Sequence, residues 1–170
     1  MKESYEIEAK DELRPAAIGK GLIKQRNTDI RTDKVHWLET FETKPQRLVY
    51  DIFEGLRQLA RTELYLPLKR FECHFSKYEA GGFYKRHSDR HANLPSRVLS
   101  CVIYLSDLMT VDGGELVLYL QDEPPVIIQP TPGKIIVFDS SIEHEVKPCS
   151  TVRRSLTGWL RTDLHPNINL

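Results

Sequence analysis

Three side chains in the sequence are of the types that bind a metal ion together. His87 and Asp89 are separated by one residue at a predicted strand. Alternate residues of a strand point to the same face, which places their Cα atoms about 6.5 Å apart. An extended run cannot also bring His91 to the same ion, because its span from His87 would be about 13 Å. The third ligand must come from elsewhere, and His144, shortly after the apolar segment that ends at Phe138, is the natural candidate.

Two imidazoles and one carboxylate would form the facial triad of non-haem Fe(II) oxygenases, which leaves three positions of an octahedral ion open. The same ligand types also suit a catalytic Zn²⁺. His-x-Asp is a short motif that arises by chance, and His144 alone could be a surface histidine. The motif by itself therefore indicates a metal site without deciding between iron, zinc and no metal.

A polar stripe on the last predicted strand offers a second functional feature. From residue 153 to residue 160, two sets alternate: Arg153, Ser155, Thr157 and Trp159 with Arg154, Leu156, Gly158 and Leu160. If Leu156 and Leu160 pack against helices, Arg153 points into the interior, where a buried guanidinium needs an anionic partner. A dicarboxylate co-substrate would provide one, although an acidic side chain or solvent could do so too. A register shift of one residue would place Arg154 there instead.

Short segments rich in Val, Ile, Tyr and Phe, separated by Gly and Pro, must position these residues, and they are typical of strands. The predicted strands cover residues 69–78, 83–88, 97–105, 115–120, 126–129, 134–138, 143–148 and 153–161. Turns are predicted at 81–82, 112–114 and 131–133, the last with Pro and Gly placed for a type II turn. Eight short strands after helical material predict a small jelly roll whose mouth can hold a ligand.

The N-terminal part of the chain has a helical pattern. Apolar residues recur at helical spacing over residues 45–64, and a weaker helix is predicted over 5–13. We therefore expect an α+β, mainly β, single domain. Its helical support would occupy about residues 1–66 and its double-stranded β-helix core about residues 67–162.

The composition excludes some classes of partner. The chain has 24 Lys and Arg against 24 Asp and Glu, which argues against nucleic-acid binding through phosphate neutralisation. No apolar run approaches the ~20 residues of a membrane helix, and residues 1–14 lack the apolar region of a secretory signal. The three cysteines lack Cys-x-x-Cys spacing and are expected to be reduced and buried. We expect a cytoplasmic protein without nucleic-acid or membrane partners.

Several ordered motifs together resemble the Fe(II)/2-oxoglutarate dioxygenases of the prolyl 4-hydroxylase type, and in particular the bacterial relatives of the animal oxygen-sensing prolyl hydroxylases. Besides His87-x-Asp89, His144 and Arg153, they are IRTDKVHWL at 30–38, YEAGGFY at 78–84, GGEL at 113–116, HEV at 144–146 and SLTGW at 155–159. The resemblance covers about residues 13–162. It implies that His87, Asp89 and His144 are iron ligands.

The resemblance also implies roles for residues around the metal. Arg153 and Tyr104 would bind the distal carboxylate of 2-oxoglutarate, and Tyr78 would line the same pocket. Leu116 and Thr157 match positions near this co-substrate.

Three further residues match positions at the substrate entrance of the family. Trp159 would lie beside the entrance, and Asp33 and Arg97 would form a salt bridge across it. The loop at 91–96 and the segment at 25–43 would determine the choice of polypeptide substrate.

The activity implied by the resemblance is hydroxylation of a prolyl residue in a partner protein, with succinate and CO₂ as co-products. Fe(II), 2-oxoglutarate and O₂ would be required, with ascorbate as a candidate reductant. The partner could belong to the translation machinery, and we expect the enzyme to be a monomer.

Three other functions compete with this hypothesis. A nucleobase or small-substrate oxygenase would share the chemistry, but base-flipping enzymes favour basic grooves, and such enzymes typically carry a second Arg where this chain has Trp159. A non-catalytic jelly-roll module could retain the metal without turnover. A zinc hydrolase would need a separate general base, and none with fitting spacing is evident.

Overall fold

The structure is a computed structural model, which describes residues 2–10, 12–16, 27–92, 94–105 and 113–164. Its elements in chain order are α1 (Lys2–Ala9), β1 (Arg14–Pro15), β2 (Lys34–Trp37), α2 (Lys44–Glu63), β3 (Arg70–Tyr78), β4 (Tyr84–His87), β5 (Arg97–Tyr104), β6 (Leu116–Tyr119), β7 (Val126–Ile128), β8 (Ile135–Asp139), β9 (Glu143–Val146) and β10 (Arg153–Arg161). All eight predicted strands of the C-terminal part are present, within a few residues of their expected bounds.

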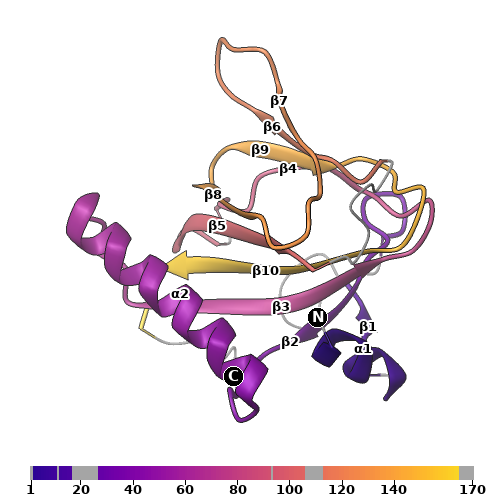
Figure 1. Cartoon of the computed structure of the whole chain (residues 1–170). Coiled ribbons are helices and arrows are strands. Elements are labelled where there is room, and N and C mark those ends of the chain that lie inside the picture. The colour runs from indigo at the N-terminus through magenta and orange to yellow at the C-terminus, as the bar shows by residue number, and fades with distance from the viewer. Residues whose placement is uncertain (1, 11, 17–26, 93, 106–112, 165–170) are drawn as a thin grey trace.

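The strands form two antiparallel sheets, which lie one above the other in Figure 1. The larger sheet has the order β1-β2-β3-β10-β5-β8, and the smaller one has the order β4-β9-β6-β7. Strand β10 lies at the centre of the larger sheet, paired along its length with β3 and with β5. The result is the mainly β jelly roll that the sequence predicts, with helix α2 lying across one face of the larger sheet (Figure 1).

Helix α2 begins and ends where its local sequence dictates. Thr43 and Gln46 form a capping box, in which the Thr43 hydroxyl accepts from the Gln46 N–H and the Gln46 side chain accepts from the Thr43 N–H. Pro45 occupies the first turn, where its missing N–H leaves no bond unmade. Beyond the C-cap Leu64, Tyr65 has a φ of 54°, which ends the helix.

The main core lies between α2 and the outer face of the larger sheet. Phe53 is fully buried and packs there with Leu156 and Leu160 of β10. Gly158 allows this close approach, because a Cβ at its position would lie 2.5 Å from the Phe53 ring. The apolar face of α2 therefore covers one side of the strand that carries Arg153 on its other side.

The sequence does not predict strands β1 and β2, which extend the larger sheet beyond β3. Strand β2 has only four residues, two of them Lys34 and His36, so it lacks the apolar run by which a strand is recognised. Its pairing with β3 defines it, with Val35 opposite Ser76 and Trp37 opposite His74. The N-terminal part thus supplies strands as well as helical support.

Other local expectations are met where the structure describes them. Gly133 has a φ of 75° and the Lys134 N–H donates to the Thr131 carbonyl, as a type II turn requires. The turn predicted at 112–114 includes residue 112, which lies outside the described residues. All three cysteines are free and buried, and burial raises the pKa of Cys73 and Cys101 to about 12. No helix in the described ranges is both long and apolar enough to cross a membrane.

Candidate metal centre and its pocket

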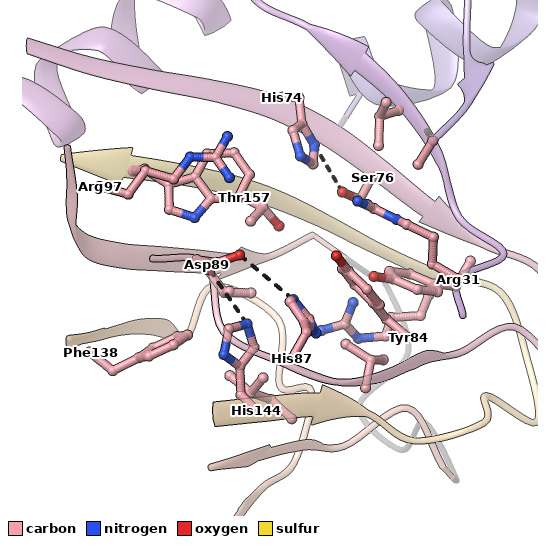
Figure 2. Close-up of a pocket in the computed structure, with 18 of the residues that line it drawn as sticks. Arg31, His74, Ser76, Tyr84, His87, Asp89, Arg97, Phe138, His144 and Thr157 are labelled. Carbon is pink, nitrogen blue, oxygen red and sulfur yellow. Dashed lines mark hydrogen bonds and ion pairs between the residues drawn. The ribbon is translucent and has the colours of Figure 1, made fainter. Parts of the chain in front are cut away.

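The three predicted ligands converge on one point between the sheets. His87 at the end of β4 lies directly opposite His144 on the antiparallel strand β9, so both imidazoles project to the same face. Asp89 follows β4 by two residues and turns its carboxylate toward both rings (Figure 2). One ligand atom from each residue lies within 4.8 Å of the others. The chain thus brings together the two imidazoles and the carboxylate that the sequence singled out.

Both histidines are held in the form that a metal requires. The Nδ1 atom of His87 is 2.8 Å from the Lys85 carbonyl, and that of His144 is 2.9 Å from the Ile142 carbonyl. A carbonyl only accepts, so each Nδ1 carries the proton and each Nε2 presents a lone pair to the centre. Burial lowers the pKa of His144, which favours this neutral form. The Nε2 atoms lie 3.6 Å and 3.4 Å from the Asp89 carboxylate oxygens.

The Asp89 side chain is buried and remains a carboxylate. Burial raises its pKa, but its interactions with the His87 and His144 side chains lower the pKa by more, so it lies below its usual range. An anionic oxygen ligand beside two neutral imidazoles fits Fe(II) and leaves open positions on the ion. The ligand types present are therefore suited to the iron that the resemblance implies.

Aromatic rings fix the imidazoles from the sides. The Tyr84 ring stacks on His87 with 3.6 Å between centroids, and the Arg31 guanidinium lies 4.2 Å above the Tyr84 ring. The Phe138 ring meets His144 edge-on at 4.9 Å. These contacts restrict rotation of both rings without occupying their Nε2 atoms.

A second functional group lies in the same cavity, built around Arg153. Arg153 is 2% exposed, and its guanidinium carbon is 5.1 Å from the ring centroids of both Tyr78 and Tyr104. Among the described residues, its Nε and the Tyr104 hydroxyl have no hydrogen-bond partner. No described carboxylate forms an ion pair with it either, so the cavity holds a buried cation that awaits an anion.

The neighbouring Arg154 has a different environment. Its guanidinium lies 2.6 Å from the Glu8 carboxylate of α1, away from the cavity. Of the two candidates for the anion-binding arginine, only Arg153 therefore lines the pocket. Gly114 makes room for it, because a Cβ there would lie 3.0 Å from the Arg153 side chain.

The remaining predicted residues of the pocket also meet there. Leu116 and Thr157 line the cavity between the sheets. Trp159 lines it as well, with its ring 5.4 Å from that of His74 and 5.9 Å from that of Trp37. Because Trp37 is partly exposed, these rings connect the cavity with the surface.

The predicted salt bridge between Asp33 and Arg97 is wrong. Asp33 is buried and accepts two hydrogen bonds from Arg31, at 2.7 Å and 2.6 Å, since the two side chains lie on the same short segment. Arg97 instead donates two hydrogen bonds to Glu72 of β3, in the same sheet, and lies 3.6 Å over the Trp159 ring. Arg97 still lines the cavity, whereas Asp33 acts on it only through Arg31.

The cavity has a volume of about 120 Å³ and is lined by all three metal-binding candidates together with Arg153. Pockets for drug-sized ligands are larger, about 300–1,000 Å³. A small dicarboxylate is a ligand whose size and charge match a cavity with a metal centre at one side and an unpaired guanidinium at the other. The residues present therefore fit 2-oxoglutarate as well as iron.

Reasoning from the sequence missed several residues that shape this site: Arg31, Trp37, His74, Ser76, Tyr84 and Ser100. The first five line the cavity, and the Ser100 hydroxyl donates a hydrogen bond to the Asp89 carboxylate. On β3 the signal was available, because His74, Ser76 and Tyr78 alternate with Phe75 and Lys77 in the way that also identified Arg153. The remaining contacts depend on pairing between distant segments, and short sequence patterns do not report them.

Comparisons with known proteins agree with this fold and site. The family model described as the 2OG-Fe(II) oxygenase superfamily matches residues 73–161, more than half of the chain. The chain therefore belongs to the 2OG-Fe(II) oxygenase superfamily. Membership confirms the class of enzyme expected from the sequence, a 2-oxoglutarate-dependent dioxygenase.

Part of the chain is similar to curated hydroxylases. A PKHD-type hydroxylase of Synechococcus sp. (strain CC9902) is 37% identical over 89 residues, which are 51% of this chain and 40% of the relative. A PKHD-type hydroxylase of Stenotrophomonas maltophilia (strain K279a) is 33% identical over 109 residues, 56% of this chain and 47% of the relative. The chain thus spans less than half the length of these relatives.

Solved structures resemble the whole described fold. A crystal structure of a Pseudomonas putida prolyl-4-hydroxylase is 33% identical, with a TM-score of 0.85 over 95% of this chain and 83% of that one. A prolyl hydroxylase from Trichoplax adhaerens, in complex with a peptide fragment of the hypoxia inducible factor oxygen degradation domain, has a TM-score of 0.80 over 95% of this chain and 76% of that one. It is 21% identical, so this second likeness concerns the fold.

Proposed function

We propose that the protein hydroxylates a prolyl residue of a partner polypeptide, using Fe(II), 2-oxoglutarate and O₂ and releasing succinate and CO₂. One observation carries the proposal. A single cavity joins the cluster of His87, Asp89 and His144 to Arg153, whose Nε has no hydrogen-bond partner within the described residues and whose guanidinium lies beside the Tyr104 ring. Iron bound by the three ligands would couple the oxidative decarboxylation of 2-oxoglutarate to hydroxylation of the substrate.

The chain's own residues hold the co-substrate. Arg153 would bind the far carboxylate through its guanidinium, and the Tyr104 hydroxyl would donate a second hydrogen bond to it. This contact supplies the anion that the buried guanidinium lacks among the described residues. It also sets the direction of the diacid, so that its other end faces the metal ligands.

Apolar side chains exclude water from the reacting centre. Val102, Leu116, Phe138 and Val146 line the cavity around the polar groups. In such a dry site, the interactions of Arg153 and of the metal ligands are stronger than they would be in water. The protein's contribution is therefore geometry and exclusion of solvent.

The mouth of the cavity supports a prolyl substrate. The Trp37 ring, which is 42% exposed and lies 5.9 Å from that of Trp159, offers a flat, apolar surface for a pyrrolidine ring beside the opening. Similarity over nearly the whole chain to the Pseudomonas putida prolyl-4-hydroxylase supports the same choice. A partner in the translation machinery, ascorbate as reductant, a monomeric state and a cytoplasmic location complete the proposal.

The test measures turnover and its product together. The protein is incubated with Fe(II), 2-oxoglutarate, O₂ and an extract of cell proteins, succinate is quantified, and proteins are mapped by mass spectrometry. We expect 2-oxoglutarate-dependent succinate release and the gain of one oxygen atom on a prolyl residue. His87→Ala removes a ligand and should abolish both, whereas His91→Ala changes an exposed histidine close by and should preserve both.

Other outcomes identify the competing functions. Metal binding without succinate from any protein or nucleic-acid substrate would indicate a binding module. Oxygen added to a nucleobase or to another amino acid would retain the dioxygenase and overturn the prolyl substrate. Equal succinate from the wild-type protein and His87→Ala would overturn the metal centre.

A further inference from the structure

The outer hydrogen bonds of the three metal-binding side chains are of two kinds. Those of His87 and His144 go to backbone carbonyls, which the strands themselves fix. That of Asp89 comes from a side chain, the hydroxyl of Ser100, at 2.7 Å from Oδ2. The orientation of the carboxylate therefore depends on the side chain at position 100, which a substitution can remove, whereas a backbone carbonyl is present whatever the residue.

Ser100 is an exception on its strand. The inner face of β5 carries Ser100, Val102 and Tyr104, so that a fully buried hydroxyl lies beside apolar and aromatic side chains. A buried hydroxyl is unfavourable unless it forms hydrogen bonds. The bond from Ser100 to Asp89 meets this requirement and explains the polar residue at this position.

A second serine supports the first. The hydroxyl of Ser140, which is also fully buried, lies 2.9 Å from that of Ser100. The Ser140 N–H donates to the Val98 carbonyl, and the Ser140 carbonyl accepts from the Arg90 N–H, both at 2.9 Å. Ser140 thus joins β5 to the segment that follows Asp89, and it holds the Ser100 hydroxyl in place.

We propose that Ser100, supported by Ser140, is a positioning residue that holds Oδ2 of Asp89 and thereby presents Oδ1 to the metal. This inference rests on the proposed function, because it takes the three side chains as metal ligands. The Ser100 hydroxyl draws negative charge toward Oδ2 and occupies one of its lone pairs. Oδ1 lies 3.6 Å from the His87 Nε2 and Oδ2 lies 3.4 Å from the His144 Nε2, so the two oxygens differ in the Ser100 hydrogen bond, which only Oδ2 accepts.

The number of carboxylate oxygens on the metal decides how many positions remain open. A facial triad with a monodentate carboxylate leaves three positions of an octahedral ion. A chelating 2-oxoglutarate takes two of them and O₂ needs the third. If Asp89 rotated and bound through both oxygens, one of these positions would be lost.

The test uses the whole protein and Mn²⁺ alone, titrated by calorimetry without 2-oxoglutarate. Ser100→Ala should weaken Mn²⁺ binding about tenfold, the usual size of losses at outer-shell partners. Ser100→Thr keeps the hydroxyl and should stay within about twofold of the wild type. Thr62→Ala removes a hydroxyl of α2, one bonded to the Gln58 carbonyl away from the cavity, and should leave Mn²⁺ affinity unchanged.

The visible spectrum of bound Co²⁺ provides a readout of coordination that stability alone does not change. We expect Ser100→Ala to alter this spectrum and Ser100→Thr to restore it. Unchanged Mn²⁺ affinity and Co²⁺ spectrum in Ser100→Ala would overturn the inference, as would equal losses in the Ala and Thr variants. Failure of the wild-type protein to bind Mn²⁺ would instead overturn the metal centre of the proposed function.

Discussion

The two faces of strand β10 differ in whether their buried side chains find partners in the protein. On the outer face, Leu156, Gly158 and Leu160 pack beneath Phe53 of α2, in a core of apolar contacts. On the inner face, Arg153 and Trp159 are buried, yet the Nε of Arg153 and the Nε1 of Trp159 have no partner within the described residues. Along this strand, residues that are fully packed thus alternate with residues that carry a polar atom without a hydrogen-bond partner within the described residues.

This difference separates stability from binding. An apolar side chain on the outer face contributes through the area it removes from water. An unpaired guanidinium on the inner face lowers stability in the free protein, and binding of an anion offsets that loss. Substitutions on the two faces should therefore act on different measurements, and they test whether the separation is real.

Phe53→Ala should have the largest effect on stability. Loss of this fully buried ring should lower the free energy of unfolding by about 3–5 kcal/mol. The folded variant should keep its Mn²⁺ affinity within about twofold, because the ring touches only the outer face. Urea unfolding and calorimetry measure the two quantities. Leu59→Ala on the exposed side of α2 is the control, and a comparable loss there would contradict the assignment of the core.

Arg153→Ala should have the opposite profile. It should weaken 2-oxoglutarate binding about 100-fold, through loss of charged hydrogen bonds. Its free energy of unfolding should not fall, since a buried unpaired cation is removed. Calorimetry with Mn²⁺ present measures the binding. Arg154→Ala, which removes an ion pair with Glu8 outside the cavity, should leave it unchanged, and the reverse result would exchange the roles of the two arginines.

Substitutions of two glycines test how closely α2 packs against the outer face of β10. Gly158→Ala should destabilise the protein by about 1–3 kcal/mol, because the new Cβ would lie 2.5 Å from the Phe53 ring. Gly55→Ala should instead stabilise it by up to about 1 kcal/mol, because this helical position has no neighbouring atom within 4 Å. Thermal or urea unfolding compares them. Equal effects would show that β10 and α2 are not as closely packed as the structure indicates.

Glu72 tests a part of the inner face that also supports stability. Burial raises the pKa of Glu72, but the charges and hydrogen bonds of Arg97 and Arg161 lower it by more, so it lies below its ordinary value. A lowered carboxyl pKa stabilises the fold above the unfolded value of about 4.3, and this contribution is lost as the pH falls through the folded pKa.

We therefore expect Glu72→Gln to lower the free energy of unfolding by about 1–2 kcal/mol at pH 7. The difference from the wild type should shrink between about pH 5 and pH 3, as Glu72 becomes protonated. Urea unfolding across this range measures it. A difference that stays constant with pH would show that the carboxylate charge is not what stabilises this end of the strand.

Much of the architecture is readable from local patterns. Period-two alternation on β10 predicts that Arg153 faces inward, and the capping signals at Thr43 and Pro45 predict the start of α2. Strand β2 was not predictable, because its four residues form a strand through pairing with β1 and β3, which lie far away in the sequence. The partner of Arg97 was likewise decided by pairing: Glu72 lies opposite Trp159 in the sheet, beneath the Arg97 guanidinium.

The sequence by itself determined which side chains could bind a metal and which strands would carry them, because residue type and periodicity are local properties. The tertiary structure alone decided that His87 lies opposite His144, that Ser100 holds Asp89, and that Arg153 remains without an anion within the described residues. These facts depend on strand register and on contacts between segments far apart in the chain. Burial makes these contacts important for the free energy, because an unpaired charge is costly only where water cannot reach it.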